Sequence, residues 1–172
     1  MENSLESIIN TISPFVEKGK WTMRVPVKLQ DHVHMTIGCI VFKTKDEAEV
    51  LAAGQCILEL ERLFKQHQAT LTSKEGKVVM LGPKNDIPAI PVEIVGSLGP
   101  VFRAWHESWV KQGLVMSEVP EAERKEKGTI FLHVTAKSGA QELTDLLLKG
   151  IKVSAVQIKP LGPQDPFMEI RV

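Results

Sequence analysis

Histidine is the residue type in this sequence best suited to chemistry, because its side chain titrates near neutral pH and binds metal ions. His32 and His34 lie two residues apart in a strand-like run, so both rings point to one face, where two ring nitrogens can begin a metal site. The sequence supplies no further ligands at a telling spacing, and a solvent-facing strand end is the better interpretation. We therefore expect neither a metal nor a cofactor.

His133 lies in the stretch GTIFLHVTAKSGAQELTDLLLKG, residues 128–150, where polar and apolar residues first alternate. No serine, cysteine or carboxylate stands at a spacing that indicates a catalytic triad with it. The chain also lacks the motifs of phosphate-binding loops, zinc proteases, α/β-hydrolases, dinucleotide-binding folds and paired redox cysteines. We interpret His133 as scaffold and expect a protein that is not an enzyme. An enzyme site assembled from scattered residues is the alternative.

Two groups of side chains are candidates for contact with a partner. Trp105 and Trp109 share one face of an expected helix, where they either pack into the core or stack on a base. The second group is a set of lysines at the ends of expected elements, and folding that gathers them would create a site for phosphates or an acidic partner. These lysines are Lys43, Lys45, Lys74, Lys77 and Lys84.

The composition is that of one soluble globular domain, with 43 % hydrophobic and 24 % charged residues. Lys plus Arg and Asp plus Glu are 21 each, so the net charge is zero. This balance weighs against sequence-blind nucleic-acid binding and lowers the electrostatic barrier to self-association. Cys39 and Cys56 form no paired motif and are expected to be buried thiols. Without a signal peptide or a membrane-spanning apolar run, the sequence predicts a cytosolic protein.

Apolar periodicity predicts an α+β fold, a single domain with a largely antiparallel sheet and three or four helices packed on it. Helices are expected over residues 4–16, 44–64, 98–113 and 138–150. Strands are expected over residues 21–29, 33–42, 92–95, 130–135 and 151–158, and near the end of the tail. A hairpin is expected to turn at residues 74–76, and loops are expected over 82–91 and 118–128.

Local signals refine this outline. Ser4 is expected to cap the first helix. The longest helix is expected to bury one apolar stripe, which consists of Val50, Ala53, Ile57, Leu60 and Phe64. Pro26 cannot donate to a sheet ladder and so predicts that residues 21–29 form an edge strand. Thr44, followed three residues later by Glu47, predicts a capping box at the start of the longest helix. The residues expected to face inward in the last helix are Leu143, Leu146 and Leu147.

Residues 1–20 are expected to form an N-terminal amphipathic segment ahead of a single domain over residues 21–172. The apolar stripe of this segment either packs on its own domain or docks on a partner or a membrane surface, and its polar face lacks the Lys and Arg that membranes favour. We expect self-association through this segment, the Pro-rich loop and the tail. The residues that we assign to it are Leu5, Ile8, Ile9, Ile12, Pro88, Pro91, Phe167 and Met168.

Three stretches carry a resemblance to a known family: the strand WTMRVPVKL, the helix DEAEVLAAGQCILEL and the run KGTIFLHVTAKSGAQELTDLLLKG. Their arrangement resembles the rhabdovirus matrix proteins, particularly the short, cytorhabdovirus-like ones of plant-infecting members, in which a KGT strand runs into a capped helix. The chain departs from the family in having no tyrosine for a Pro-rich budding motif and no basic N-terminal arm. Of the functions of that family, membrane attachment and budding-factor recruitment are therefore the ones that the resemblance implies least for this chain.

The resemblance implies a non-enzymatic structural protein of the virion and host cytoplasm that self-associates and bridges nucleocapsid and envelope. Its partners would be further copies of itself, in a homo-oligomer or an open helical layer, together with the viral nucleocapsid and the membrane surface. The alternative is a cytosolic module that binds RNA or a host factor, such as a viral silencing suppressor. In that case the contact residues are Lys43, Lys45, Lys74, Lys77, Trp105 and Trp109.

Overall fold

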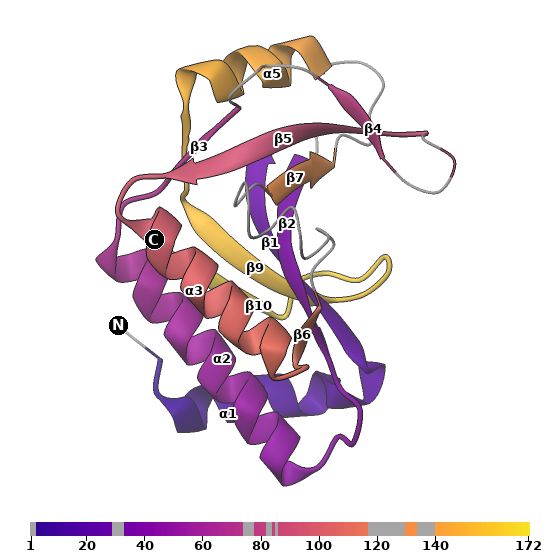
Figure 1. Ribbon diagram of the computed structural model, residues 1–172. Helices are drawn as coiled ribbons and strands as arrows, with labels where there is room; N and C mark the ends of the chain where they lie inside the picture. The colour runs from indigo at the N-terminus through magenta and orange to yellow at the C-terminus, as the bar shows by residue number, and fades with distance from the viewer. Residues whose placement is uncertain are drawn as a thin grey trace.

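The computed structural model places helices at two ends of the molecule, with antiparallel strands between them (Figure 1). It describes residues 3–28, 33–73, 78–81, 84, 86–116, 130–133 and 140–172. The helices are α1 (Leu5–Ile12), the 3-10 helix η1 (Ser13–Lys18), α2 (Glu47–Gln66), α3 (Leu98–Lys111) and α5 (Ala140–Lys149). The strands are β1 (Lys20–Lys28), β2 (Val33–Val41), β3 (Thr70–Thr72), β4 (Val79–Leu81), β5 (Ile87–Val95), β6 (Val115–Met116), β7 (Ile130–His133), β8 (Ile151–Lys152), β9 (Ala155–Pro160) and β10 (Met168–Arg171).

The strands pair in the order β10-β9-β1-β2-β7-β5-β3-β8, with β4 also on β5 and β6 also on β2. Each of these pairings is antiparallel. Helices α1, α2 and α3 pack together at one end of the molecule, and α5 lies over β5 at the other (Figure 1). The expected fold class, a single α+β domain with a largely antiparallel sheet, is confirmed.

β1 is an interior strand, so the expectation of an edge strand from Pro26 is wrong. β2 pairs along one side of β1, and β9 pairs with residues 21–24 on the other. Pro26 lies beyond the last residue paired with β9, next to a register shift in the pairing with β2. The proline therefore avoids the part of β1 that is paired on both sides, and the strand can still lie inside the sheet.

Two expectations for residues 70–95 are also wrong. β3 and β4 do not form a hairpin with each other, because β3 pairs with residues 93–95 of β5 and β4 with residues 87–89. The two lie in line along one edge of β5, whose other edge pairs with β7. Residues 87–91 of the expected Pro-rich loop are instead the first half of β5. Pro91 lies between the stretches paired with β4 and β3, where a missing N–H costs least. The expected turn at residues 74–76 lies outside the described residues.

The long helix α2 supplies the stripe predicted to face the core. Ala53, Ile57, Leu60 and Phe64 are buried and Val50 is half-buried, which confirms that prediction. These side chains join one continuous apolar core that includes residues from β1, β2, β5 and α3.

α5 packs on the sheet through a narrow strip of leucine side chains. Leu143 and Leu147 are buried as expected, whereas Leu146 is 37 % exposed, so its expected inward orientation is wrong. The helix packs on β3, and the N–H of Ser73 donates to the carbonyl of Leu147 at 3.3 Å. Because the contact follows residues four apart, the side chain of Leu146 falls beside the strip.

The apolar stripe of α1 packs on α2 of the same chain. Ile8 and Ile12 are buried, and Leu5 and Ile9 are half-buried. Gly54 of α2 makes room for them, because a Cβ built there would lie 3.0 Å from Ile9 Cγ1 and 3.1 Å from Leu5 Cδ1. A contact with a second copy through these four side chains would therefore require α1 to leave α2.

Hydrogen bonds stabilise the start of α1 and hold it against α2. The predicted cap Ser4 accepts the N–H of Ser7 and completes a capping box. The backbone N–H of Asn3 donates to Glu61 Oε1 at 2.9 Å, and its side-chain amide donates to Glu61 Oε2 at 2.8 Å. Glu61 is buried and has Lys65 Nζ 3.6 Å away. The N-terminal segment thus satisfies a buried carboxylate of α2.

Candidate functional site

The turn from β2 to α2 holds two of the lysines singled out in the sequence, Lys43 and Lys45. The cap of α2 is Asp46, whose carboxylate accepts the N–H of Glu49 at 2.9 Å. The expectation that Thr44 caps this helix is therefore wrong by two residues. The signal that identifies the real cap is the Asp-x-x-Glu spacing of residues 46–49, which is itself a capping-box pattern.

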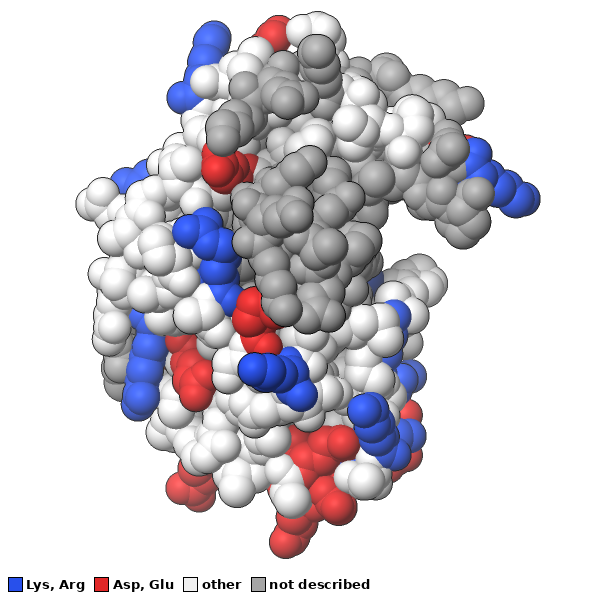
Figure 2. Space-filling view, viewed as in Figure 1, with Lys and Arg blue, Asp and Glu red and all other residues white. Residues whose placement is uncertain are grey.

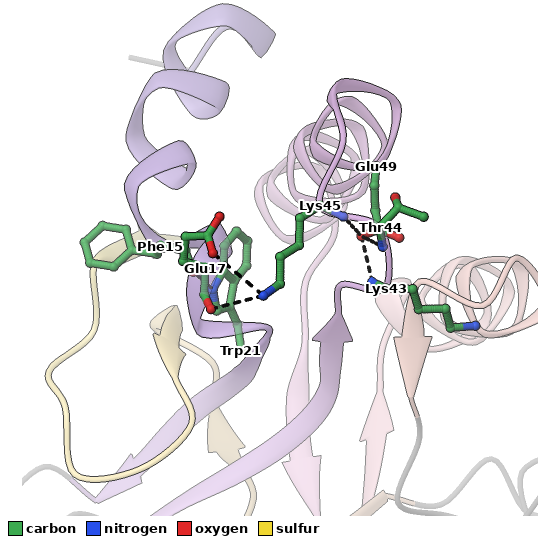
Figure 3. Close-up of polar contacts among 7 residues, drawn as sticks. All are labelled: Phe15, Glu17, Trp21, Lys43, Thr44, Lys45 and Glu49. Atoms are coloured by element: carbon green, nitrogen blue, oxygen red, sulfur yellow. Dashed lines mark hydrogen bonds and ion pairs between the residues drawn. The ribbon is translucent and has the colours of Figure 1, made fainter.

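The carboxylate of Glu49 organises the whole turn (Figure 3). Its Oε1 accepts the backbone N–H groups of Lys43 at 2.8 Å, Thr44 at 3.1 Å and Lys45 at 2.9 Å. Lys45 adopts a left-handed conformation with φ 59°, which helps the three N–H groups converge. A concavity of backbone N–H groups is a common anion site in proteins, and here the chain fills it with its own side chain.

The ammonium group of Lys45 turns toward the N-terminal segment. Its Nζ lies 3.4 Å from the carbonyl oxygen of Glu17 and 3.9 Å from Glu17 Oε2 (Figure 3). Lys43 and Lys45 thus share the turn region with four carboxylates, which belong to Glu17, Asp46, Glu47 and Glu49. Four carboxylates this near Lys43 and Lys45 disfavour phosphate binding at the turn.

A cleft of about 340 Å³ opens beside this turn, between the start of α2 and the end of α3. Lys43 and Glu49 line it on one side, and Trp109 and Gln112 on the other. The Lys43 ammonium lies against the end of α3, 3.3 Å from a Cβ built on Gly113. A cation there complements the negative end of the α3 dipole. None of the residues that line this cleft is a histidine or a cysteine.

Trp105 and Trp109 are buried where α3 packs on α2. The indole N–H of Trp105 donates to the carbonyl of Cys56 at 3.2 Å, and that of Trp109 donates to Glu59 Oε2 at 2.8 Å. Their rings belong to the core, which is the first of the two alternatives stated for this pair, and neither ring is exposed for stacking on a base. His106 of the same helix is also buried, and its ring stacks on that of Phe102 with 6.0 Å between the ring centroids.

The two thiols are buried and unpaired with each other, as expected. Burial raises the pKa of the Cys56 thiol well above its usual range, and the nearby carboxylate of Glu59 raises it further. A protonated thiol is a poor nucleophile, so Cys56 is inert at neutral pH.

The remaining candidates are spread over the fold. Pro88 and Pro91 are half-buried on β5, and Phe167 and Met168 pack against the core at the start of β10. Lys74 and Lys77, like His32, lie outside the described residues. Of the three lysines in this set that the structure describes, Lys43 and Lys45 lie in the same turn. Lys84 is exposed in the short connection between β4 and β5.

Backbone register places His34 of β2 directly opposite His133 of β7, a pairing that sequence spacing cannot indicate. No group of three or more His, Cys, Asp or Glu side chains in the described part of the chain could hold a metal ion. Within the same residues, no helix is both long and apolar enough to cross a bilayer. Comparison with protein families, with curated proteins and with solved structures finds no match.

We expect Glu49→Ala to lower the free energy of unfolding by about 1–3 kcal/mol, because three N–H groups lose a charged acceptor. Urea denaturation followed by circular dichroism measures the change. Glu47→Ala, an exposed residue in the same turn of α2, is the matched control and should change stability by less than about 0.5 kcal/mol. Equal effects of the two substitutions would contradict the role assigned to Glu49.

Proposed function

We propose that this chain is a non-enzymatic structural protein of the matrix type, which self-associates and bridges a viral nucleocapsid and an envelope. Two kinds of observation support the proposal. The first is the resemblance of residues 21–29, 46–60 and 127–150 to rhabdovirus matrix proteins. The second is a group of exposed apolar side chains at one end of the molecule.

The observation that carries the proposal is a group of exposed apolar side chains at the α5 end of the molecule. Four of the nine large hydrophobic side chains that are exposed in the described residues lie on α5 or at β4. We call this set the α5 surface, and its members are Val78, Met80, Leu146 and Leu148. Single exposed apolar residues need no explanation, but a group at one end of a domain favours contact with another protein.

Charge distribution favours a second copy of the same chain as that protein. The net charge is zero, so copies do not repel one another at long range. On the side drawn in Figure 2, Lys and Arg side chains are scattered singly, and Asp and Glu gather at the lower end around the start of α2. The described residues on this side are of mixed sign and form no broad basic patch, which suits protein contacts better than sequence-blind RNA binding.

We expect Leu148→Lys to reduce self-association by roughly tenfold or more, because it places a charge on the most exposed leucine of the α5 surface. Sedimentation velocity over a range of protein concentrations, with electron microscopy of the largest species, measures the change. The apparent molecular mass should fall while the unfolding midpoint stays the same.

Leu51→Lys on α2 is the matched control, since Leu51 is 42 % exposed and lies away from the α5 surface. It should assemble like the unaltered chain. A Leu148→Lys protein that assembles as well as the Leu51→Lys protein would remove the α5 surface from the proposal. A chain that binds RNA with a steep salt dependence would favour the alternative class instead.

A further inference from the structure

β10 is the last strand on its side of the described sheet, and none of the described strands pairs with its outer edge. Among the described residues, β10 pairs with β9 alone. The N–H of Val172 donates to the carbonyl of Ser154, so it points toward β9. Because N–H directions alternate along a strand, the N–H and C=O groups of Glu169 and Arg171 point outward. An edge of this kind is a template for strand addition.

A ladder of polar side chains crosses the sheet and ends at this edge. Arg24 Nε of β1 donates to Gln157 Oε1 of β9 at 3.1 Å. Gln157 Nε2 donates to Glu169 Oε2 of β10 at 3.0 Å, and Arg171 Nε donates to Glu169 Oε1 at 3.0 Å. The hydrogen bond from Gln157, together with Arg171, lowers the pKa of Glu169, so this carboxylate is ionised at neutral pH.

The sequence of β10 is complementary to itself in an antiparallel arrangement. A two-fold axis through Ile170 places Glu169 of one copy opposite Arg171 of the other, and the same pair occurs a second time by symmetry. These are the residues with outward backbone groups, so each pair also exchanges two N–H···O bonds. The axis sets Met168 opposite Val172, which is 49 % exposed in the single chain.

We propose that two copies of this chain pair through β10, antiparallel and two-fold, to form one continuous sheet. Charged side chains often protect edge strands, because like charges that meet across the edge repel a second copy. The opposite charges of Glu169 and Arg171 instead attract it in this one register. The polar ladder of each copy then continues into the other. This inference deepens the proposed self-association and rests on it, but it names an interface separate from the α5 surface.

Charge reversal across the interface tests the pairing. Glu169→Arg and Arg171→Glu each turn both cross-strand pairs into like charges and should weaken dimerisation roughly ten- to a hundredfold. The double reversal exchanges the two charges, restores opposite pairs within and between copies, and should restore the dimer. Sedimentation equilibrium on the full chain measures the dissociation constant, and thermal unfolding shows that each variant is folded.

Disulfide cross-linking tests the register of the proposed β10 pairing. With Met168→Cys and Val172→Cys together, mild oxidation should give a disulfide-linked dimer on a non-reducing gel, because the two positions face each other across the axis. Leu161→Cys, at an exposed residue after β9, is the control and should give no disulfide-linked dimer on the same gel.

The outcomes separate the interface from the proposed function. If single reversals associate like the unaltered chain, or the double reversal fails to restore the dimer, pairing through β10 is overturned while self-association stands. If the unaltered chain is monomeric at every concentration, both the interface and the proposed function are overturned. Loss on single reversal, recovery on double reversal and the specific cross-link together support the inference.

Discussion

Trp21→Ala is expected to lower the free energy of unfolding by about 3–5 kcal/mol, which is the usual cost of truncating a buried aromatic residue. Trp21 is fully buried at the start of β1, and its indole N–H donates to the carbonyl of Phe15 at 2.9 Å (Figure 3). Its ring meets Phe42 edge-on at 4.6 Å and Phe167 at 4.9 Å. One side chain thus joins the N-terminal segment, the end of β2 and the segment before β10.

Chemical denaturation measures this loss, and hydrogen exchange shows where it acts. Because Phe167 immediately precedes β10 and also stacks on Phe15 at 4.2 Å, amides of β9 and β10 should exchange faster in the Trp21→Ala protein. Trp21→Phe is the control, which keeps most of the packing and should cost clearly less. A loss below about 1 kcal/mol for Trp21→Ala would mean that this aromatic group does not anchor the tail.

Ile12→Ala has the second largest expected effect, about 2–5 kcal/mol, because this fully buried side chain of α1 would leave a cavity. The substitution tests whether residues 1–20 fold together with the rest of the chain. If α1 belongs to the same cooperative unit, the whole protein should become less stable while unfolding stays a single transition. Circular dichroism follows the helices and strands of the whole chain, and fluorescence follows the surroundings of Trp21, Trp105 and Trp109. The two unfolding curves should coincide.

Asn10→Ala is the matched control, since Asn10 is an exposed residue of the same helix and should change stability by less than about 0.5 kcal/mol. Separate transitions by the two probes, or no change in the main transition, would show α1 to be an independent segment. In that case the four apolar side chains of its stripe would again be candidates for contact with a partner.

Sequence patterns predicted most of the local structure, because helix caps and apolar stripes act over a few residues. Ser4 at the start of α1 and the stripe of α2 are both where periodicity and capping place them. The errors concern pairing between distant segments. Gly76 indicated a reversal, yet β3 and β4 both run along β5, because pairing with a long central strand buries more than a short hairpin does.

The candidate site was harder to predict, because a residue's role depends on what the fold places beside it. Lys45 looks like a free cation in the sequence, but four carboxylates come from the adjoining turn and from η1, 28 residues earlier along the chain. Trp105 and Trp109 share a face as predicted, but only the position of α2 decides that this face is internal. The complementarity of Glu169 and Arg171 becomes visible only when β10 is known to be an edge.

Sedimentation velocity of the unaltered chain, from low to high concentration in a low-salt buffer, tests the central claim most directly. If the protein is a building block whose function lies on its outer surfaces, the sedimentation coefficient should rise steadily with concentration as copies associate. A single monomeric species at every concentration would contradict that claim.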